Sequence, residues 1–165
     1  MTIETGDEAP DFDLEVDRDE RAALADYRGS RNVLLVFHPF SWTPVCEEEA
    51  LDLEENLGSF ESAETDVILV SCDPAPSRKA WKEKLGLSYT VASDFWPHGA
   101  VARAYGVFNE ETGAPVRGTF LIDKEGTVVW SLVSGSFTRL HTTVPSLSIR
   151  KVPRTGAPVS SLKTP

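Results

Sequence analysis

The chain has 165 residues, of which 26 are acidic and 16 basic, and its net charge is −10. The charge is uneven, because residues 1–125 carry −15 and the remaining residues carry +5. This length predicts one domain with a stable core, and its acidic surface argues against nucleic acids and anionic membranes as partners.

Two strands are predicted in the first part of the chain. Phe12, Leu14 and Val16 alternate with acidic residues, as in a half-exposed strand. The run from Val33 to Phe37 is unbroken and apolar, which indicates a strand buried on both faces of a sheet.

After a short turn the apolar residues follow the period of a helix with one buried face. The residues of that face are Cys46, Ala50, Leu53, Leu57 and Phe60. Thr43 is the expected N-cap and Pro44 fits the first helical position, which places Cys46 in the first turn. Free N–H groups and the helix dipole favour a thiolate there by roughly 0.3 to 1 kcal/mol. Because Glu47 to Glu49 oppose that thiolate, it needs a basic partner from elsewhere in the chain.

The remaining predicted elements alternate between strands and helices and end in a hairpin. They are a buried strand at 67–71, a helix with Trp81 and Leu85 on one face and Gly86 at its end, a short strand at 89–92, a short helix at 100–105 and a hairpin at 118–134. This order predicts an α/β fold in which helices flank a central mixed β-sheet.

Arg117 is the best candidate for the basic partner of Cys46. It stands immediately before the first strand of the hairpin, from which an arginine can reach the N-terminus of a neighbouring helix. At roughly 4 Å and an effective dielectric of about 20, such a charge would contribute on the order of 4 kcal/mol and outweigh the glutamates.

These residues resemble a known family. Pro39, Thr43 and Cys46 have the spacing of the peroxiredoxin motif, and Arg117 stands where that family carries a second basic residue. Residues 6–12, 93–99 and 105–109 are similar to the one-cysteine peroxiredoxins of the alkyl hydroperoxide reductase E type, and the resemblance runs from about residue 6 to residue 135. It implies a thioredoxin-like fold and a thiol-dependent peroxidase.

The resemblance also implies a role for each residue of the motif. Cys46 is expected to be the peroxidatic cysteine, whose thiolate attacks a hydroperoxide and becomes a sulfenic acid. Arg117 is expected to hold the thiolate and the peroxide oxygens, while the Thr43 hydroxyl forms hydrogen bonds at the same spot. Pro39 is expected to cap the pocket and shield the sulfur from water.

Two further residues are supporting candidates, and the resemblance implies partners as well. Glu49 is expected to orient the arginine, and Trp42 to support the site from the loop before Cys46. The expected substrate is hydrogen peroxide or an organic hydroperoxide. The expected reductant is a low-molecular-weight thiol or a thioredoxin-, glutaredoxin- or mycoredoxin-like protein. A homodimer is implied, without a cofactor or metal ion.

The sequence also favours a reducing compartment. It has two cysteines, no run approaching 18 apolar residues, and an N-terminus without a basic region followed by an apolar run. We therefore expect a soluble, cytoplasmic protein.

Alternatives remain open at this point. Cys72 could resolve the sulfenic acid, as in a two-cysteine enzyme of the bacterioferritin-comigratory type, although core filler is the favoured interpretation of this cysteine. The chain could also be a peroxide sensor without turnover. A zinc site from Cys46, Cys72, His38 and His98 lacks paired spacing. A cysteine hydrolase would need His38, His98 or His141 as its base.

The C-terminal part departs from the resembling family. We expect a thioredoxin-like domain over residues 1–137 and a basic tail over residues 138–165. The tail contains no acidic residue and shows no helical period, so we expect it to be poorly ordered. A basic arm that docks on the acidic core is the alternative.

Overall fold

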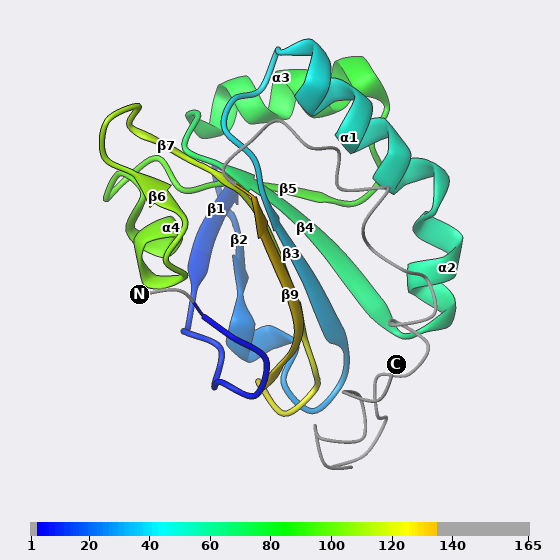
Figure 1. The fold of residues 1–165 in the computed structure, drawn as a ribbon. Coiled ribbons are helices and arrows are strands. Elements are labelled where there is room, and N and C mark those ends of the chain that lie inside the picture. Colours follow the sequence, from blue (N-terminus) through cyan, green and yellow to red (C-terminus); the bar gives the residue numbers. More distant parts are fainter. Residues whose placement is uncertain (1–2, 135–165) are drawn as a thin grey trace.

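A seven-stranded mixed sheet forms the centre of the structure (Figure 1). The computed structural model describes residues 3–134. The strand order is β2-β1-β5-β4-β3-β8-β9, in which β4 pairs in parallel with β3 and β5 and the other pairs are antiparallel. The strands are β1 (Asp13–Asp17), β2 (Glu20–Ala23), β3 (Asn32–Phe37), β4 (Thr65–Ser71), β5 (Thr90–Ser93), β8 (Arg117–Ile122) and β9 (Val128–Ser134). The predicted α/β architecture with a mixed sheet is confirmed.

Helices lie on both faces of this sheet and give it two hydrophobic cores (Figure 1). They are α1 (Pro44–Glu55), α2 (Leu57–Ser62) and α3 (Ala75–Leu85) on one face, and the short α4 (Ala100–Ala104) on the other. Strand β3 contributes to both cores: Leu34 and Val36 pack with α1 and α3, whereas Leu35 and Phe37 pack with α4. This double burial is why β3 has a continuous apolar sequence.

The predicted helix around the cysteine is wrong in its length. It divides at Asn56 into α1 and α2, although Leu57 and Phe60 keep the apolar period. The Asn56 side chain donates a hydrogen bond to the carbonyl oxygen of Asp52 at 2.8 Å, and Gly58 follows. Asparagine competes in this way with the helical backbone and glycine is a weak helix former, so the helix ends there.

Some short elements were not predicted. They are β2, a 3-10 helix at Leu24–Asp26, and a small two-stranded sheet of β6 (Phe108–Asn109) and β7 (Ala114–Pro115). Strand β2 buries only Ala22, so it has no apolar alternation to detect. None of the helices in the described part of the chain has the length and apolar content needed to cross a membrane.

Candidate active site

The turn between β3 and α1 carries the sequence motif. Strand β3 ends at Phe37 and α1 begins at Pro44, so residues 38–43 form the loop between them. Thr43 occupies the N-cap position with extended backbone angles, Pro44 follows at the first helical position, and Cys46 lies in the first turn with 2% of its surface exposed. The predicted start of the helix is confirmed.

The Thr43 side chain does not cap the helix, in contrast to the prediction. Its hydroxyl donates instead to the carbonyl oxygen of Phe40 at 2.9 Å, three residues earlier in the same loop. A threonine hydroxyl donates to a carbonyl oxygen and accepts from an N–H group, and here the bond to the local carbonyl is formed while the bond from the helix N–H group is not. The lone pairs of this oxygen remain able to accept a hydrogen bond.

A buried cluster of three side chains joins α1 to β8. Arg117, the first residue of β8, donates from Nη2 to Cys46 Sγ at 3.2 Å and from Nη1 to Glu49 Oε1 at 2.9 Å. Cys46 and Glu49 are three residues apart on α1 and so share one helix face. Arg117 and Glu49 are 1% and 0% exposed. Removing one partner from such a buried ion pair leaves an uncompensated charge, which costs about 3–5 kcal/mol.

The loop also carries Pro39 and Trp42, the two remaining candidate residues. Pro39 is half-buried and is the second residue after β3. Trp42 is 44% exposed, and its indole Nε1 donates to the hydroxyl of Ser77 on α3 at 3.1 Å. The Nζ of Lys84 stands 5.4 Å from the centre of the Trp42 ring, in cation–π range. Trp42 therefore ties the loop to α3.

A second buried network, centred on Arg78 of α3, was missed by sequence reasoning. Its guanidinium bonds His38 Nε2 at 2.7 Å and Ser41 Oγ at 2.8 Å, both in the loop before Cys46. One signal was available: Arg78 lies three residues before Trp81 and so falls on the buried face of α3. Burial and the charges of Arg78 and Arg117 hold the pKa of His38 well below its ordinary value, so this imidazole is neutral.

Cys72 is also buried, but its surroundings differ. It follows β4 directly, is 5% exposed, and is a free thiol like Cys46. Burial, assisted by the charges of Asp94 and Asp73, raises the pKa of the Cys72 thiol to about 12. At neutral pH this sulfur therefore carries a proton and is a poor nucleophile.

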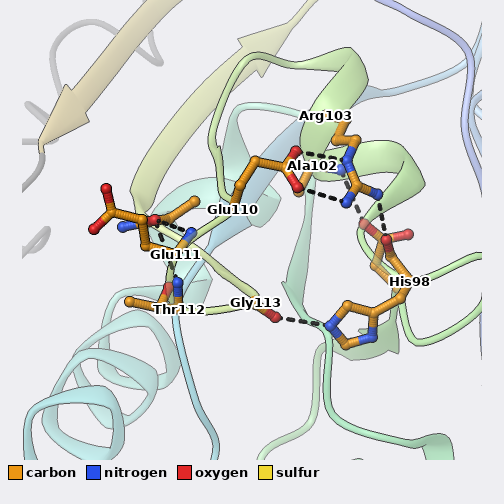
Figure 2. A network of polar contacts seen from close by, with 9 residues as sticks. His98, Ala102, Arg103, Glu110, Glu111, Thr112 and Gly113 are labelled. Carbon is orange, nitrogen blue, oxygen red and sulfur yellow. Dashed lines mark hydrogen bonds and ion pairs between the residues drawn. The ribbon is translucent and has the colours of Figure 1, made fainter.

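The histidines of the described chain are engaged in structural contacts. His38 Nε2 accepts from Arg78, and His98 Nε2 contacts the carbonyl oxygen of Gly113 at 2.7 Å (Figure 2). Arg103 binds the Glu110 carboxylate through two nitrogens and donates to the carbonyl oxygen of His98, which fixes α4 against residues 108–113 (Figure 2). Within residues 3–134, neither imidazole forms a hydrogen bond with Cys46, and His141 lies outside the described residues.

Within residues 3–134, no group of three or more histidine, cysteine, aspartate or glutamate side chains is arranged to hold a metal ion. The expected tail over residues 138–165 also lies outside the described residues, as does the end of the domain expected at residue 137.

The chain is similar to known proteins over most of its length. The chain matches the AhpC/TSA family over residues 5–131. It belongs to this family of peroxiredoxins. Alkyl hydroperoxide reductase E of Mycobacterium tuberculosis is 42% identical over 126 residues, which cover 76% of this chain and 82% of that protein. Peroxiredoxin Bcp of Bacillus subtilis is 36% identical over 135 residues, 78% of this chain and 84% of that protein.

Solved structures show the same fold. Peroxidoxin BcpB of Mycobacterium tuberculosis superimposes with a TM-score of 0.79 at 27% identity, over 92% of this chain and 98% of that one. The reduced two-cysteine peroxiredoxin of Plasmodium vivax gives a TM-score of 0.71 at 29% identity, over 79% of this chain and 72% of that one. The predicted thioredoxin-like fold is confirmed, and the chain is a thiol-dependent peroxidase.

Proposed function

We propose that this peroxiredoxin reduces hydrogen peroxide and organic hydroperoxides at Cys46. The proposal rests on one observation: Arg117 Nη2 lies 3.2 Å from Cys46 Sγ while Glu49 holds Nη1 of the same guanidinium. The thiolate attacks one peroxide oxygen, an S–O bond forms, and the O–O bond breaks. The leaving oxygen takes the electron pair and then a proton, and departs as water or an alcohol. The sulfur, oxidised by two electrons, becomes a sulfenic acid.

Arg117 has two tasks in this step. Its charge-assisted hydrogen bond favours the thiolate before the reaction. As negative charge moves from the sulfur to the leaving oxygen, the same fixed donors stabilise the new position of the charge. Glu49 restricts the rotation of the guanidinium, so little reorganisation is needed at the moment of reaction.

Thr43 and Pro39 are proposed to shape the peroxide pocket. The Thr43 hydroxyl donates to Phe40, so its lone pairs can accept the hydrogen of the incoming peroxide. That contact directs the peroxide oxygens toward the sulfur. Pro39 lacks an N–H group and presents only carbon and its carbonyl to the pocket, which limits the access of water.

The sulfenic acid is proposed to be reduced by an external thiol. The thiol forms a mixed disulfide with Cys46 and releases water. A second thiol then attacks the reductant sulfur of that mixed disulfide, so the two reductant thiols leave as a disulfide and the Cys46 thiolate is restored. A low-molecular-weight thiol or a thioredoxin-, glutaredoxin- or mycoredoxin-like protein would supply both. Cys72 is less suited to this attack because its pKa of about 12 keeps it protonated. Such a cycle requires a compartment rich in reduced thiols, which favours the cytoplasm.

We propose that a homodimer forms through the exposed loops that follow strands β3 and β5. Four large apolar side chains are exposed by 44–82%, namely Phe40, Trp42, Phe95 and Trp96. These residues follow β3 and β5. Both strands pair in parallel with β4, so the two loops lie at the same end of the strands. Exposed aromatic groups of this kind are typical of interfaces. Sedimentation of the wild type and of a Trp96→Glu variant tests this assembly, and two monomeric proteins would contradict it.

Intact mass spectrometry after one equivalent of peroxide tests the assignment of the cysteines. The wild type and Cys72→Ala are expected to gain the mass of one oxygen atom, located on Cys46 by peptide mapping. Cys46→Ser is expected to gain none. A Cys46–Cys72 disulfide would instead favour the two-cysteine mechanism. With a thiol present, an enzyme consumes peroxide in many-fold molar excess over the protein, whereas a sensor consumes about one equivalent.

A further inference from the structure

Arg78 is a buried cation that has no role in the reaction proposed above. It lies in the first turn of α3 and none of its side chain is exposed. Its guanidinium donates to four neutral acceptors, namely Ala92 O at 2.9 Å, Leu69 O at 2.7 Å, His38 Nε2 at 2.7 Å and Ser41 Oγ at 2.8 Å. The first two belong to strands β5 and β4, and the last two to the loop before Cys46.

Arg78 keeps its positive charge at neutral pH, and no carboxylate of residues 3–134 forms an ion pair with it. Burial lowers the pKa of Arg78 only to about 10, so the guanidinium is protonated at neutral pH. Asp73 is the nearby acid, and its Oδ2 accepts from Ser41 N at 2.8 Å and Ser71 Oγ at 2.6 Å. Arg117, by contrast, contacts Glu49 directly.

The positive charge of Arg78 reaches the sulfur of Cys46. A thiolate at Cys46 or at Cys72 raises the pKa of Arg78, so the guanidinium lies within electrostatic range of both sulfurs. An interaction between two titrating groups is mutual. At Cys72 the effect is outweighed by burial and by two carboxylates.

The same side chain also fixes the loop of residues 38–43. Because the guanidinium can only donate, His38 accepts through Nε2, and the neutral ring carries its proton on Nδ1. A second bond holds Ser41, whose backbone N–H is bound by Asp73. Helix α3 and the turn before it therefore determine the path of the chain into the helix that carries Cys46.

We infer that Arg78 is a second cationic positioning residue of the peroxidatic site. It holds the loop through His38 and Ser41, and its unneutralised charge favours the Cys46 thiolate. This inference rests on the proposed role of Cys46. The titratable groups that interact with Arg78 are His38, Asp73, Tyr89, Cys46 and Cys72, and Cys46 also accepts a hydrogen bond from Arg117, which pairs with Glu49.

Three variants at two adjacent positions of α3 separate the effect of the Arg78 charge from the effect of its packing. Arg78→Met removes the charge and the four bonds, Arg78→Lys keeps the charge, and Lys79→Met removes an exposed charge that pairs with Asp17 at 2.9 Å. The measurements are the pH midpoint of Cys46 alkylation, followed by peptide mass, and the rate constant for hydrogen peroxide. Thermal stability is recorded in parallel for each variant.

We expect Arg78→Met to raise the alkylation midpoint by about one pH unit, as for a unit charge several ångströms away at an effective dielectric of about 20. The peroxide rate constant is expected to fall at least tenfold. Arg78→Lys should keep the midpoint but lose roughly threefold in rate, because an ammonium cannot reproduce the planar fork. Lys79→Met should match the wild type in both.

A further variant covers the case in which Arg78→Met does not fold. Ser41→Ala removes one bond of the guanidinium and keeps its charge, so a slower rate at an unchanged midpoint is expected. Equal midpoint shifts in Arg78→Lys and Arg78→Met would overturn the role of the charge. Wild-type midpoints and rates in the folded variants, with lower thermal stability alone, would make Arg78 purely structural. If Cys46→Ser retained activity, the proposed function would fail instead.

Discussion

Cys46 and Cys72 are both buried at the same end of the parallel strands, yet they differ in their chemistry. Cys46 follows β3 in the first turn of a helix and accepts a hydrogen bond from Arg117. Cys72 follows β4 directly, and burial with two nearby carboxylates raises its pKa to about 12. Their exposed fractions, 2% and 5%, are nearly equal. Exposure therefore does not separate the two thiols, whereas their charged neighbours differ: an arginine contacts Cys46, and two carboxylates add to the effect of burial at Cys72.

The first prediction has the largest expected effect on activity and concerns the two cysteines themselves. Cys46→Ser should reduce peroxidase activity to the uncatalysed level and leave the fold intact, because an alcohol is a far weaker nucleophile than a thiolate. Cys72→Ser is the matched control and should retain activity with an external thiol. A peroxide-consumption assay with both variants measures this difference. An inactive Cys72→Ser that is folded would show that the second sulfur takes part.

The second prediction removes the charge that favours Cys46. Arg117→Ala should slow the peroxide step by at least about tenfold, because a loss of roughly 1.4 kcal/mol is a modest share of a close charge interaction. It should also move the pH midpoint of Cys46 alkylation upward. Arg103→Ala is a suitable control, since that arginine pairs with Glu110 at the surface. Identical alkylation curves for Arg117→Ala and the wild type would contradict the role assigned to this residue.

The third prediction concerns the Thr43 hydroxyl. Thr43→Val should lower the peroxide rate constant about fivefold, the equivalent of one hydrogen bond of about 1 kcal/mol. Since the hydroxyl does not cap α1, the loss of stability should be smaller than for a true N-cap. Thr43→Ser should keep most of the activity. Equal losses in the valine and serine variants would mean that the methyl group is what matters.

The fourth prediction concerns the carboxylate that holds the arginine. Glu49→Gln keeps an acceptor for Arg117 Nη1 but removes its charge, so the rate constant should fall only about threefold, while stability falls by about 3–5 kcal/mol because the buried charge of Arg117 is left uncompensated. Glu47→Gln makes the same chemical change on the less buried side of the helix and should alter neither. Chemical denaturation and peroxide kinetics measure the two effects separately. Indistinguishable results for the two variants would remove Glu49 from the site.

Local signals made part of this site predictable. The start of α1 follows from Thr43 and Pro44, which are adjacent in sequence, and Cys46 takes its place in the first turn from that boundary. The buried strands could be found because a sheet covered on both faces requires continuous apolar runs. The family motif then identified Arg117, although it contacts Cys46 across 71 positions of the chain.

The remaining features depend on contacts that no local pattern encodes. Arg78 meets Ser41 and His38 across 37 and 40 positions, and neither pair has a recognisable spacing. The Thr43 hydroxyl had two possible partners, and only the path of the loop selects the Phe40 carbonyl. Helix α1 ended early because a single asparagine side chain bonded the backbone, while the apolar period continued past it.

The last prediction concerns the alkaline stability that Cys72 contributes. The pKa of this thiol rises from 9.0 to about 12 on folding, so the unfolded chain loses the proton at a lower pH than the folded one. The contribution of the protonated thiol to stability is therefore complete below pH 9 and is lost as the pH rises toward 12. The free energy of unfolding of the wild type should fall more steeply over this range than that of Cys72→Ala. The measurement is denaturant unfolding under reducing conditions at several alkaline pH values, where the buried tyrosines contribute equally to both proteins. Parallel curves would show that Cys72 ionises as readily in the folded chain as in the unfolded one, and the contrast between the two cysteines would then be lost.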